Sequence, residues 1–245
     1  MAGHSKWANT KHRKERQDAK RGKLFANLIR AVEAAARQGG TDPEGNATLY
    51  NAIEKAKDAS VPKENIERAI ARGGGDVDGV DYEEVWYEGY AAGGVALYVQ
   101  VLTDNRNRAA AAVRSTFTRM GGSLGEPGSV SYLFAPKGII VASGDEEAVM
   151  LAALDGGAED VTGSAEQWEI VCLPGDLAAV RASLEVAGVV VERAEVTQLP
   201  STSVVLDEPN ARRVLRLVDA LEDLDDVQEV FANFDIPDEI LESVG

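Results

Sequence analysis

The sequence predicts an α+β protein in which an N-terminal three-helix bundle is followed by two ferredoxin-like α/β domains, one inserted in the other. Two observations support this fold class. Residues 1–76 show apolar side chains at helical spacing only, whereas residues 77–245 alternate short strands with amphipathic helices. Within the second part, residues 136–202 follow the order βαββαβ, which is typical of the ferredoxin-like fold.

Three short helices are expected in residues 1–76. The apolar stripes are Leu24, Phe25, Leu28, Ile29 and Val32 in the first helix, Leu49, Ile53 and Ala56 in the second, and Ile66 and Ile70 in the third. The pair Gly39 and Gly40 stops the first helix, and Pro62 opens the third. The glycine triplet at 73–75 ends the third helix and is expected to act as a hinge.

The remaining elements are expected to form two sheets. The first set comprises strands at 83–90 and 95–103, a helix at 106–120, a Gly-rich loop at 121–128 and a strand at 129–134. The inserted set comprises strands at 138–142, 159–162, 168–173 and 189–198, with helices at 145–154 and 174–187. A helix at 208–221 and a strand at 227–233 return to the first set. The predicted domains are therefore residues 1–76, residues 77–135 with 203–245, and residues 136–202.

Charge is distributed very unevenly along the chain. The net charge is −16, yet residues 1–37 hold 10 Lys and Arg against 3 Asp and Glu, while residues 38–245 hold 15 against 38. A basic arm on an acidic body directs the protein toward a polyanion through one end only, and nucleic acid is the leading candidate. The same acidity excludes a protein that coats nucleic acid with its whole surface.

The candidate nucleic-acid-binding residues form two sets. The arm supplies cations for phosphate and rings for stacking on exposed bases, at Lys6, Trp7, Lys11, His12, Arg13, Lys14, Arg16, Lys20, Arg21 and Lys23. The second set is Arg106, Arg108, Arg114 and Arg119, on the helix that leads into the Gly-rich loop, whose mobility would let it reach a phosphate backbone. A solvated tail is the alternative for the arm, and a plain helix-to-strand connection is the alternative for the second set.

The sequence offers little material for an enzyme or a metalloprotein. His4 and His12 are its only histidines and Cys172 its only cysteine, so a His-based zinc site, a catalytic triad or an intramolecular disulfide lacks the necessary residues. We therefore expect no catalytic residues, no metal and no cofactor. No apolar run approaches the roughly 18 residues of a membrane helix, and the N-terminus has no apolar signal segment. A cytoplasmic protein without a membrane partner is expected.

Several long motifs stand out along the chain. One is the opening Met-Ala-Gly-His-Ser-Lys-Trp-Ala-Asn-Thr-Lys-His-Arg-Lys at 1–14, and another is Asp-Ala-Lys-Arg-Gly-Lys-Leu-Phe at 18–25. Others are Leu-Thr-Asp-Asn-Arg at 102–106, Gly-Ser-Val-Ser-Tyr-Leu-Phe at 128–134 and Ala-Leu-Glu-Asp-Leu-Asp-Asp-Val at 220–227. These motifs resemble those of the YebC/PmpR family, and the resemblance extends along the whole chain.

The resemblance implies three domains, an N-terminal helical bundle and two α/β domains, in a cytoplasmic DNA-binding transcriptional regulator. It also implies an alternative, because relatives include a mitochondrial translational activator of cytochrome oxidase and bacterial members that ease ribosomes past proline-rich stretches. We therefore expect a non-enzymatic, monomeric regulator of gene expression whose partner is DNA or ribosomal RNA, with the ribosome itself a further candidate. The sequence lacks an obvious helix-turn-helix signal, which favours the RNA alternative on physical grounds.

Overall fold

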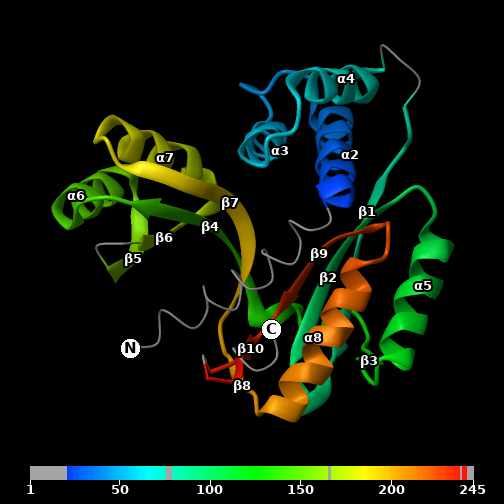
Figure 1. The fold of residues 1–245 in the computed structure, drawn as a ribbon. Helices are drawn as coiled ribbons and strands as arrows, with labels where there is room; N and C mark the ends of the chain where they lie inside the picture. The colour runs from blue at the N-terminus through cyan, green and yellow to red at the C-terminus, as the bar shows by residue number, and fades with distance from the viewer. Residues whose placement is uncertain (1–20, 76–78, 165–166, 238, 242–245) are drawn as a thin grey trace.

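Three groups of elements, each with its own apolar core, make up the fold in the computed structural model, which describes residues 21–75, 79–164, 167–237 and 239–241 (Figure 1). Helices α2 to α4 form the first group. Two antiparallel four-stranded sheets, each covered by two helices, form the others. This architecture confirms the predicted α+β class.

The helical bundle consists of α2 (Arg21–Gly39), α3 (Ala47–Asp58) and α4 (Lys63–Gly74). The apolar stripes predicted for the three helices meet in one core, in which Val32, Leu49 and Ile66 are buried. Asn46 caps α3, because its side-chain oxygen accepts a hydrogen bond from the Leu49 N–H at 3.1 Å. These contacts fix the three helices as one unit.

Gly73 lets α4 approach α2 closely. A Cβ added at this position would lie 2.5 Å from the Glu33 carbonyl oxygen and 2.6 Å from the Ala36 Cβ. Gly75 follows with φ of 85°, a left-handed conformation that ends α4. Gly73 is therefore a packing position and not part of the hinge expected there, and residues 76–78, which follow, lie outside the described residues.

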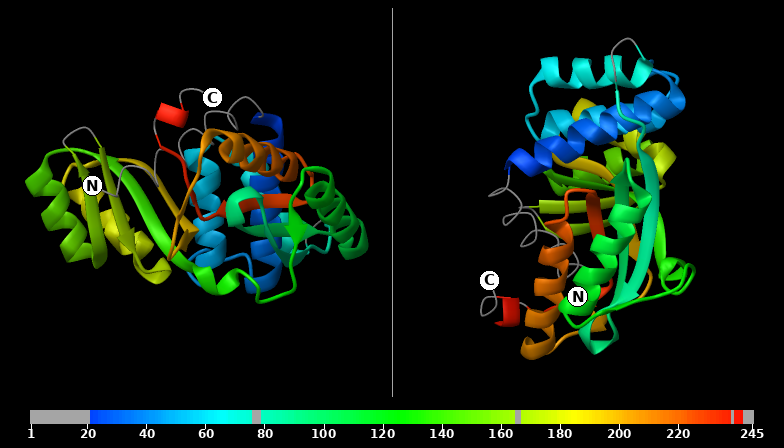
Figure 2. Two further views of the ribbon diagram at one scale, coloured as in Figure 1. Left: turned by 90° about the horizontal axis from the view of Figure 1, so that it is seen from below. Right: turned by 90° about the vertical axis from the view of Figure 1, so that its right-hand side faces the viewer.

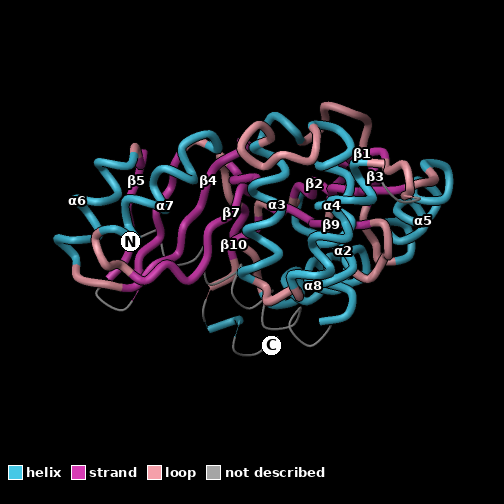
Figure 3. The backbone as a smooth tube through the Cα atoms, turned by 90° about the horizontal axis from the view of Figure 1, so that it is seen from above, coloured by secondary structure: helices cyan, strands magenta, loops and turns pink. Residues whose placement is uncertain are grey.

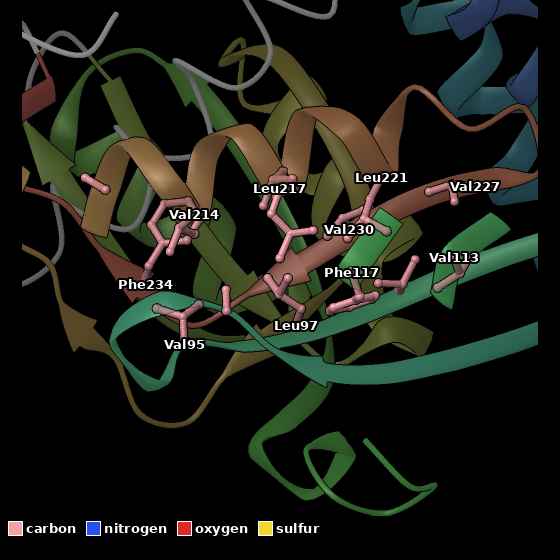
Figure 4. Packing of buried hydrophobic residues seen from close by; sticks show 14 of the residues in the cluster. Val95, Leu97, Val113, Phe117, Val214, Leu217, Leu221, Val227, Val230 and Phe234 are labelled. Atoms are coloured by element: carbon pink, nitrogen blue, oxygen red, sulfur yellow. The ribbon is translucent and has the colours of Figure 1, made fainter. Parts of the chain in front are cut away.

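The first sheet has the strand order β3-β1-β2-β9 and is covered on one face by α5 and α8. Its strands are β1 (Glu83–Tyr90), β2 (Ala96–Thr103), β3 (Ser123–Leu124) and β9 (Val227–Ala232), and its helices are α5 (Arg106–Arg119) and α8 (Glu208–Glu222). A short 3-10 turn, Ala92–Gly94, joins β1 to β2. Alternation along β2 turns Leu97 toward the helices, where it packs with Phe117 and Leu217 (Figure 4).

The second sheet has the strand order β5-β6-β4-β7, which is the ferredoxin-like arrangement predicted for this part of the chain. Its strands are β4 (Phe134–Ser143), β5 (Ala158–Ser164), β6 (Gln167–Cys172) and β7 (Val190–Pro200), with α6 (Glu146–Gly156) and α7 (Leu177–Val186) on one face. A 3-10 turn, Pro174–Asp176, precedes α7, so the helix predicted from 174 begins later.

The two sheets differ in chain order. In a ferredoxin-like chain order, the strand that corresponds to β1 would come after β3. In the first sheet this strand instead comes first in the chain, before β2. The chain then leaves for the second sheet and returns through α8 and β9, as expected for an insertion. The return includes β8 (Val204–Val205), which pairs in parallel with β10 (Phe234–Asp235). The limits given for the three domains stay a prediction.

One predicted strand is wrong. Residues 129–134 contain a 3-10 turn, Ser131–Leu133, and the strand β3 lies instead inside the predicted loop. The reason is the carboxylate of Glu88, which accepts hydrogen bonds from the N–H groups of Gly128, Val130 and Ser131 at 2.7, 2.6 and 2.8 Å. These amides are turned toward one point and cannot join a ladder.

Candidate nucleic-acid interface

The predicted interface begins with the basic arm. Eight of its predicted residues, Lys6, Trp7, Lys11, His12, Arg13, Lys14, Arg16 and Lys20, lie outside the described residues. Arg21 is the first residue of α2. The arm therefore joins the described structure at the N-terminal end of this helix, and its role stays a prediction.

The beginning of α2 is fixed against the connection between α8 and β9. The Lys23 ammonium donates hydrogen bonds to the carbonyl oxygens of Glu222 and Leu224, the second at 2.8 Å. The Asn27 amide donates to the Val227 carbonyl at 3.0 Å. Lys23 thus binds carbonyl groups at the C-terminal end of α8, where the helix dipole favours a cation. Its side chain is turned toward the protein, whereas a phosphate contact would require it to point outward.

Two of the four predicted arginines on α5 are held by carboxylates. Arg106 pairs with Glu83 at 2.8 Å, and Arg108 pairs with Asp226 at 2.8 Å and with Asp104 at 2.7 Å. The hydrogen bond from Arg108 lowers the pKa of Asp104 below its ordinary value. Nucleic acid would have to compete with these carboxylates for Arg106 and Arg108.

The other two arginines, Arg114 and Arg119, are exposed in the C-terminal half of α5. This helix contains no acidic residue, so Arg114 and Arg119 have no acidic neighbour on α5 itself. Gly122, directly after the helix, approaches the Leu217 side chain of α8, so this end of α5 lies beside α8 (Figure 2). Repulsion among the cations favours an anionic ligand here.

Three further arginines on α8 extend this cationic surface, and the sequence analysis missed them. Arg212, Arg213 and Arg216 are exposed, although Arg212 is paired with Glu208 at 2.8 Å. Val214 and Leu217 of the same helix are buried. The spacing of the three arginines, by one and four residues, places them on the outer side of an amphipathic helix, and this spacing was the signal that could have found them. We call Arg114, Arg119, Arg212, Arg213 and Arg216 together the arginine surface.

Two backbone amides of the Gly-rich loop are engaged by Glu88. The N–H of Gly125 donates to the backbone oxygen of Glu88 at 2.8 Å, and the N–H of Gly128 donates to the Glu88 carboxylate. These donors are satisfied within the protein, and a carboxylate in this position repels an anion. The expected contact of this loop with a phosphate backbone stays a prediction, and it could not use these two amides.

A central cleft of about 700 Å³ lies where the bundle and the two sheets meet. Residues of α2 and α3 line one side of it, and residues of β4, β6, β7 and β9 line the others. α3 lies against β7 at this junction (Figure 3). Lys55 of α3 joins all three groups, since its ammonium is 3.1 Å from both the Glu195 carboxylate of β7 and the Glu229 carboxylate of β9.

Within the described ranges, no three His, Cys, Asp or Glu side chains are grouped so that they could hold a metal ion. The described helices include none that is both long and apolar enough to span a bilayer.

Comparison with known proteins places both parts of the chain in one family. Residues 5–76 match the TACO1/YebC protein N-terminal domain, and residues 82–234 match the TACO1/YebC second and third domain. Proteins described as probable transcriptional regulatory proteins are 59% identical in Thermobifida fusca and 57% identical in Salinispora arenicola, each over the full length of both chains.

A solved structure has the same fold. The crystal structure of a conserved hypothetical protein from Aquifex aeolicus is 50% identical, covers 91% of this chain and 94% of its own, and superimposes with a TM-score of 0.80. Matches over both parts of the chain and over its full length lead to one conclusion, which the sequence motifs also predicted: the chain belongs to the TACO1/YebC family.

Proposed function

We propose that this protein is a non-enzymatic, cytoplasmic, DNA-binding regulator of transcription that acts as a monomer. Its contacts with nucleic acid are made by the basic arm and by the arginine surface on α5 and α8. The proposal rests above all on one observation, the five exposed arginines of that surface in a chain whose net charge is −16. The names of the relatives agree with this function.

The charge distribution also sets how the protein would bind. Cations on the arm and on the arginine surface would neutralise phosphates and release counterions, which accounts for most non-specific affinity for a duplex. The acidic remainder would face away from the nucleic acid. Such a one-sided arrangement limits the footprint and orients the protein on its ligand.

Ribosomal RNA is a second candidate, favoured by the surface of the bundle. In α4, Lys63 and Arg68 alternate with Glu64 and Glu67, and α3 carries equal numbers of acidic and basic residues. Among the described helices of the bundle, neither α3 nor α4 therefore offers a cationic recognition helix for a major groove. A basic arm with Trp7 and His12 suits unstacked bases better.

The test is a binding titration over a range of salt concentrations with a DNA duplex and with a single-stranded RNA of the same sequence. Replacing Lys11, Arg13, Lys14 and Arg16 with Ala should weaken binding. It should also lower the slope of log K against log salt by roughly 3–4 for the duplex, because about four phosphate contacts are lost. Replacing Arg114 and Arg119 should lower it by roughly 2.

The matched control replaces Lys57, Lys63, Arg68 and Lys137 with Ala, which removes the same number of positive charges from the bundle and the second sheet. This variant should keep most of the wild-type slope. Equal losses in the control and the arm variant would refute a localised interface. Crosslinking in cells then separates the two candidates, since enrichment at promoters supports DNA and enrichment in ribosomal RNA supports the translational alternative.

A further inference from the structure

Both sheets face the central cleft with the side that is not covered by their own helices. On β4, Ile139 and Val141 face the cleft, whereas Ile140 belongs to the core beneath α6 and α7. On β9, Phe231 faces the cleft, while Val230 packs beneath α8. The period of two along a strand therefore presents to the shared cleft the side of each sheet that faces away from its own helices.

The cleft is strongly acidic. Among the described residues that line it, seven carry a carboxylate and three carry a cationic group, Lys23, Lys55 and Arg193. Lys55 and Arg193 are already paired with carboxylates of the lining. The lining therefore has a net excess of four negative charges. Because the walls of a cleft have a low dielectric constant, they focus the negative electrostatic potential, which attracts cations. The same potential repels nucleic acid.

The basic arm is attached at the rim of this cleft. Lys23, Leu24 and Asn27, in the first turns of α2, line it, so the chain that precedes Arg21 starts from its edge. Residues 5–20 carry six Lys and Arg against Glu15 and Asp18, a net charge of +4. This charge is equal and opposite to the excess of the lining.

We propose that the central cleft binds the basic arm of the same chain, residues 5–20, and that nucleic acid competes with the cleft for the arm. Docking in the cleft is an inference from the cleft itself, while the competition rests on the function proposed above. Attachment at the rim gives the arm an effective concentration in the millimolar range, so modest individual contacts suffice to hold it. The apolar side chains of the lining would accommodate Trp7 and the aliphatic parts of Lys and Arg.

This arrangement is autoinhibitory. An arm held in the cleft cannot neutralise phosphates, so the apparent affinity for nucleic acid falls in proportion to the fraction of molecules with a released arm. If the arm is docked in nine molecules of ten, loss of docking raises the affinity about tenfold. Only a ligand with a high density of phosphates would displace it, which suppresses weak non-specific binding.

Docking is tested first on the unmodified protein, by zero-length carbodiimide crosslinking of amines to carboxylates at low salt, followed by mass spectrometry. Arm lysines such as Lys11 and Lys14 should crosslink within one chain to cleft carboxylates, including Glu169, Asp219 and Asp223. Crosslinks spread equally over exposed carboxylates outside the cleft, at Glu44, Glu126 and Asp155, would overturn the proposal.

Competition is tested with a charge variant and a matched control. The cleft variant is Glu169→Gln, Asp219→Asn and Asp223→Asn, and the control is Glu44→Gln, Glu126→Gln and Asp155→Asn, which changes the net charge equally. The cleft variant should bind the DNA duplex about tenfold more tightly than the control. Equal affinities would refute the competition.

The two proposals fail separately. Cleft crosslinks that persist in the presence of excess DNA or RNA, in a protein that binds neither, would support docking of the arm and contradict the nucleic-acid function. Salt-dependent binding through the arm with no preference of its lysines for cleft carboxylates would support the function and contradict docking. Because the crosslinking uses the wild-type chain, this comparison does not depend on the folding of the variants.

Discussion

At the scale of single residues, Glu88 shows how one side chain can determine a loop. It is 8% exposed, and its carboxylate accepts hydrogen bonds from three backbone N–H groups of the segment that links β3 to β4. Burial disfavours its charged form, but the hydrogen bonds from Gly128, Val130 and Ser131 outweigh burial and lower its pKa. The loop is therefore held by a charge and not by a sheet ladder.

We expect Glu88→Gln to destabilise the protein by about 2 kcal/mol at pH 7, because a neutral amide accepts weaker hydrogen bonds and leaves amides unpaired. A carboxyl whose pKa is lowered on folding stabilises the native state above its unfolded value, and this contribution is lost as the pH falls through the folded value. The difference between wild type and variant in urea unfolding should therefore shrink from pH 7 toward pH 3. Glu126→Gln, at an exposed position of the same segment, should change little at either pH.

The arginines of α5 differ in whether carboxylates hold them, and this difference predicts different effects on DNA binding. Arg108 is held by Asp226 and Asp104, while Arg114 and Arg119 are exposed on a helix with no acidic residue. We expect Arg114→Ala and Arg119→Ala each to lower the salt slope of duplex binding by about 1. Arg108→Ala should lower it by less. A larger decrease in slope for Arg108→Ala would show that the ion pairs of Arg108 with Asp226 and Asp104 break when DNA binds.

At the scale of elements, the contact between α2 and α4 depends on Gly73. We expect Gly73→Ala to destabilise the protein by about 2 kcal/mol, because the new methyl group would clash with the Glu33 carbonyl and force the helices apart. Gly22→Ala, in α2, meets nothing within 4 Å and should be neutral or slightly stabilising. Thermal unfolding of the two variants measures the difference, and equal transition temperatures would contradict the packing role.

At the scale of the whole molecule, the three groups are joined by ion pairs around the cleft. Lys55 links α3 to β7 and β9, and Arg181 of α7 is 3.3 Å from the Asp58 carboxylate at the end of α3. The Glu195 side chain is only 5% exposed and is paired with Lys55 and Arg193, so its charge depends on these two cations. The arrangement of the groups therefore depends on a few partly buried charges.

We expect Lys55→Met to destabilise the protein by about 2 kcal/mol, because Glu195 and Glu229 would face each other without the cation between them. The cost stays below that of a fully buried pair, since Lys55 is one-third exposed. Lys57→Met, which removes an exposed partner of Glu54 within α3, should cost less than about 0.5 kcal/mol. Urea unfolding gives both values, and X-ray scattering should show a larger radius for the Lys55 variant alone.

The sequence by itself determined the fold class, the helices and the family. The family followed from the resemblance of long motifs. Local signals were sufficient for the fold class and the helices, because apolar periodicity, capping residues and turn glycines act over a few neighbouring positions, and the ferredoxin-like order of residues 136–202 follows from them. The same signals failed at residues 129–134, where the partner of the backbone amides is Glu88, some forty positions away.

Only the tertiary structure decided which charges act together. It brought α8, which carries Arg212, Arg213 and Arg216, beside α5, and it paired Arg106 and Arg108 with carboxylates. It also turned the sheet faces opposite their own helices toward one acidic cleft. Electrostatic surfaces of this kind are sums over residues that are distant in sequence. Composition revealed that the chain has a basic end and an acidic body, but folding alone brought the acidic lining to the point where the basic arm begins.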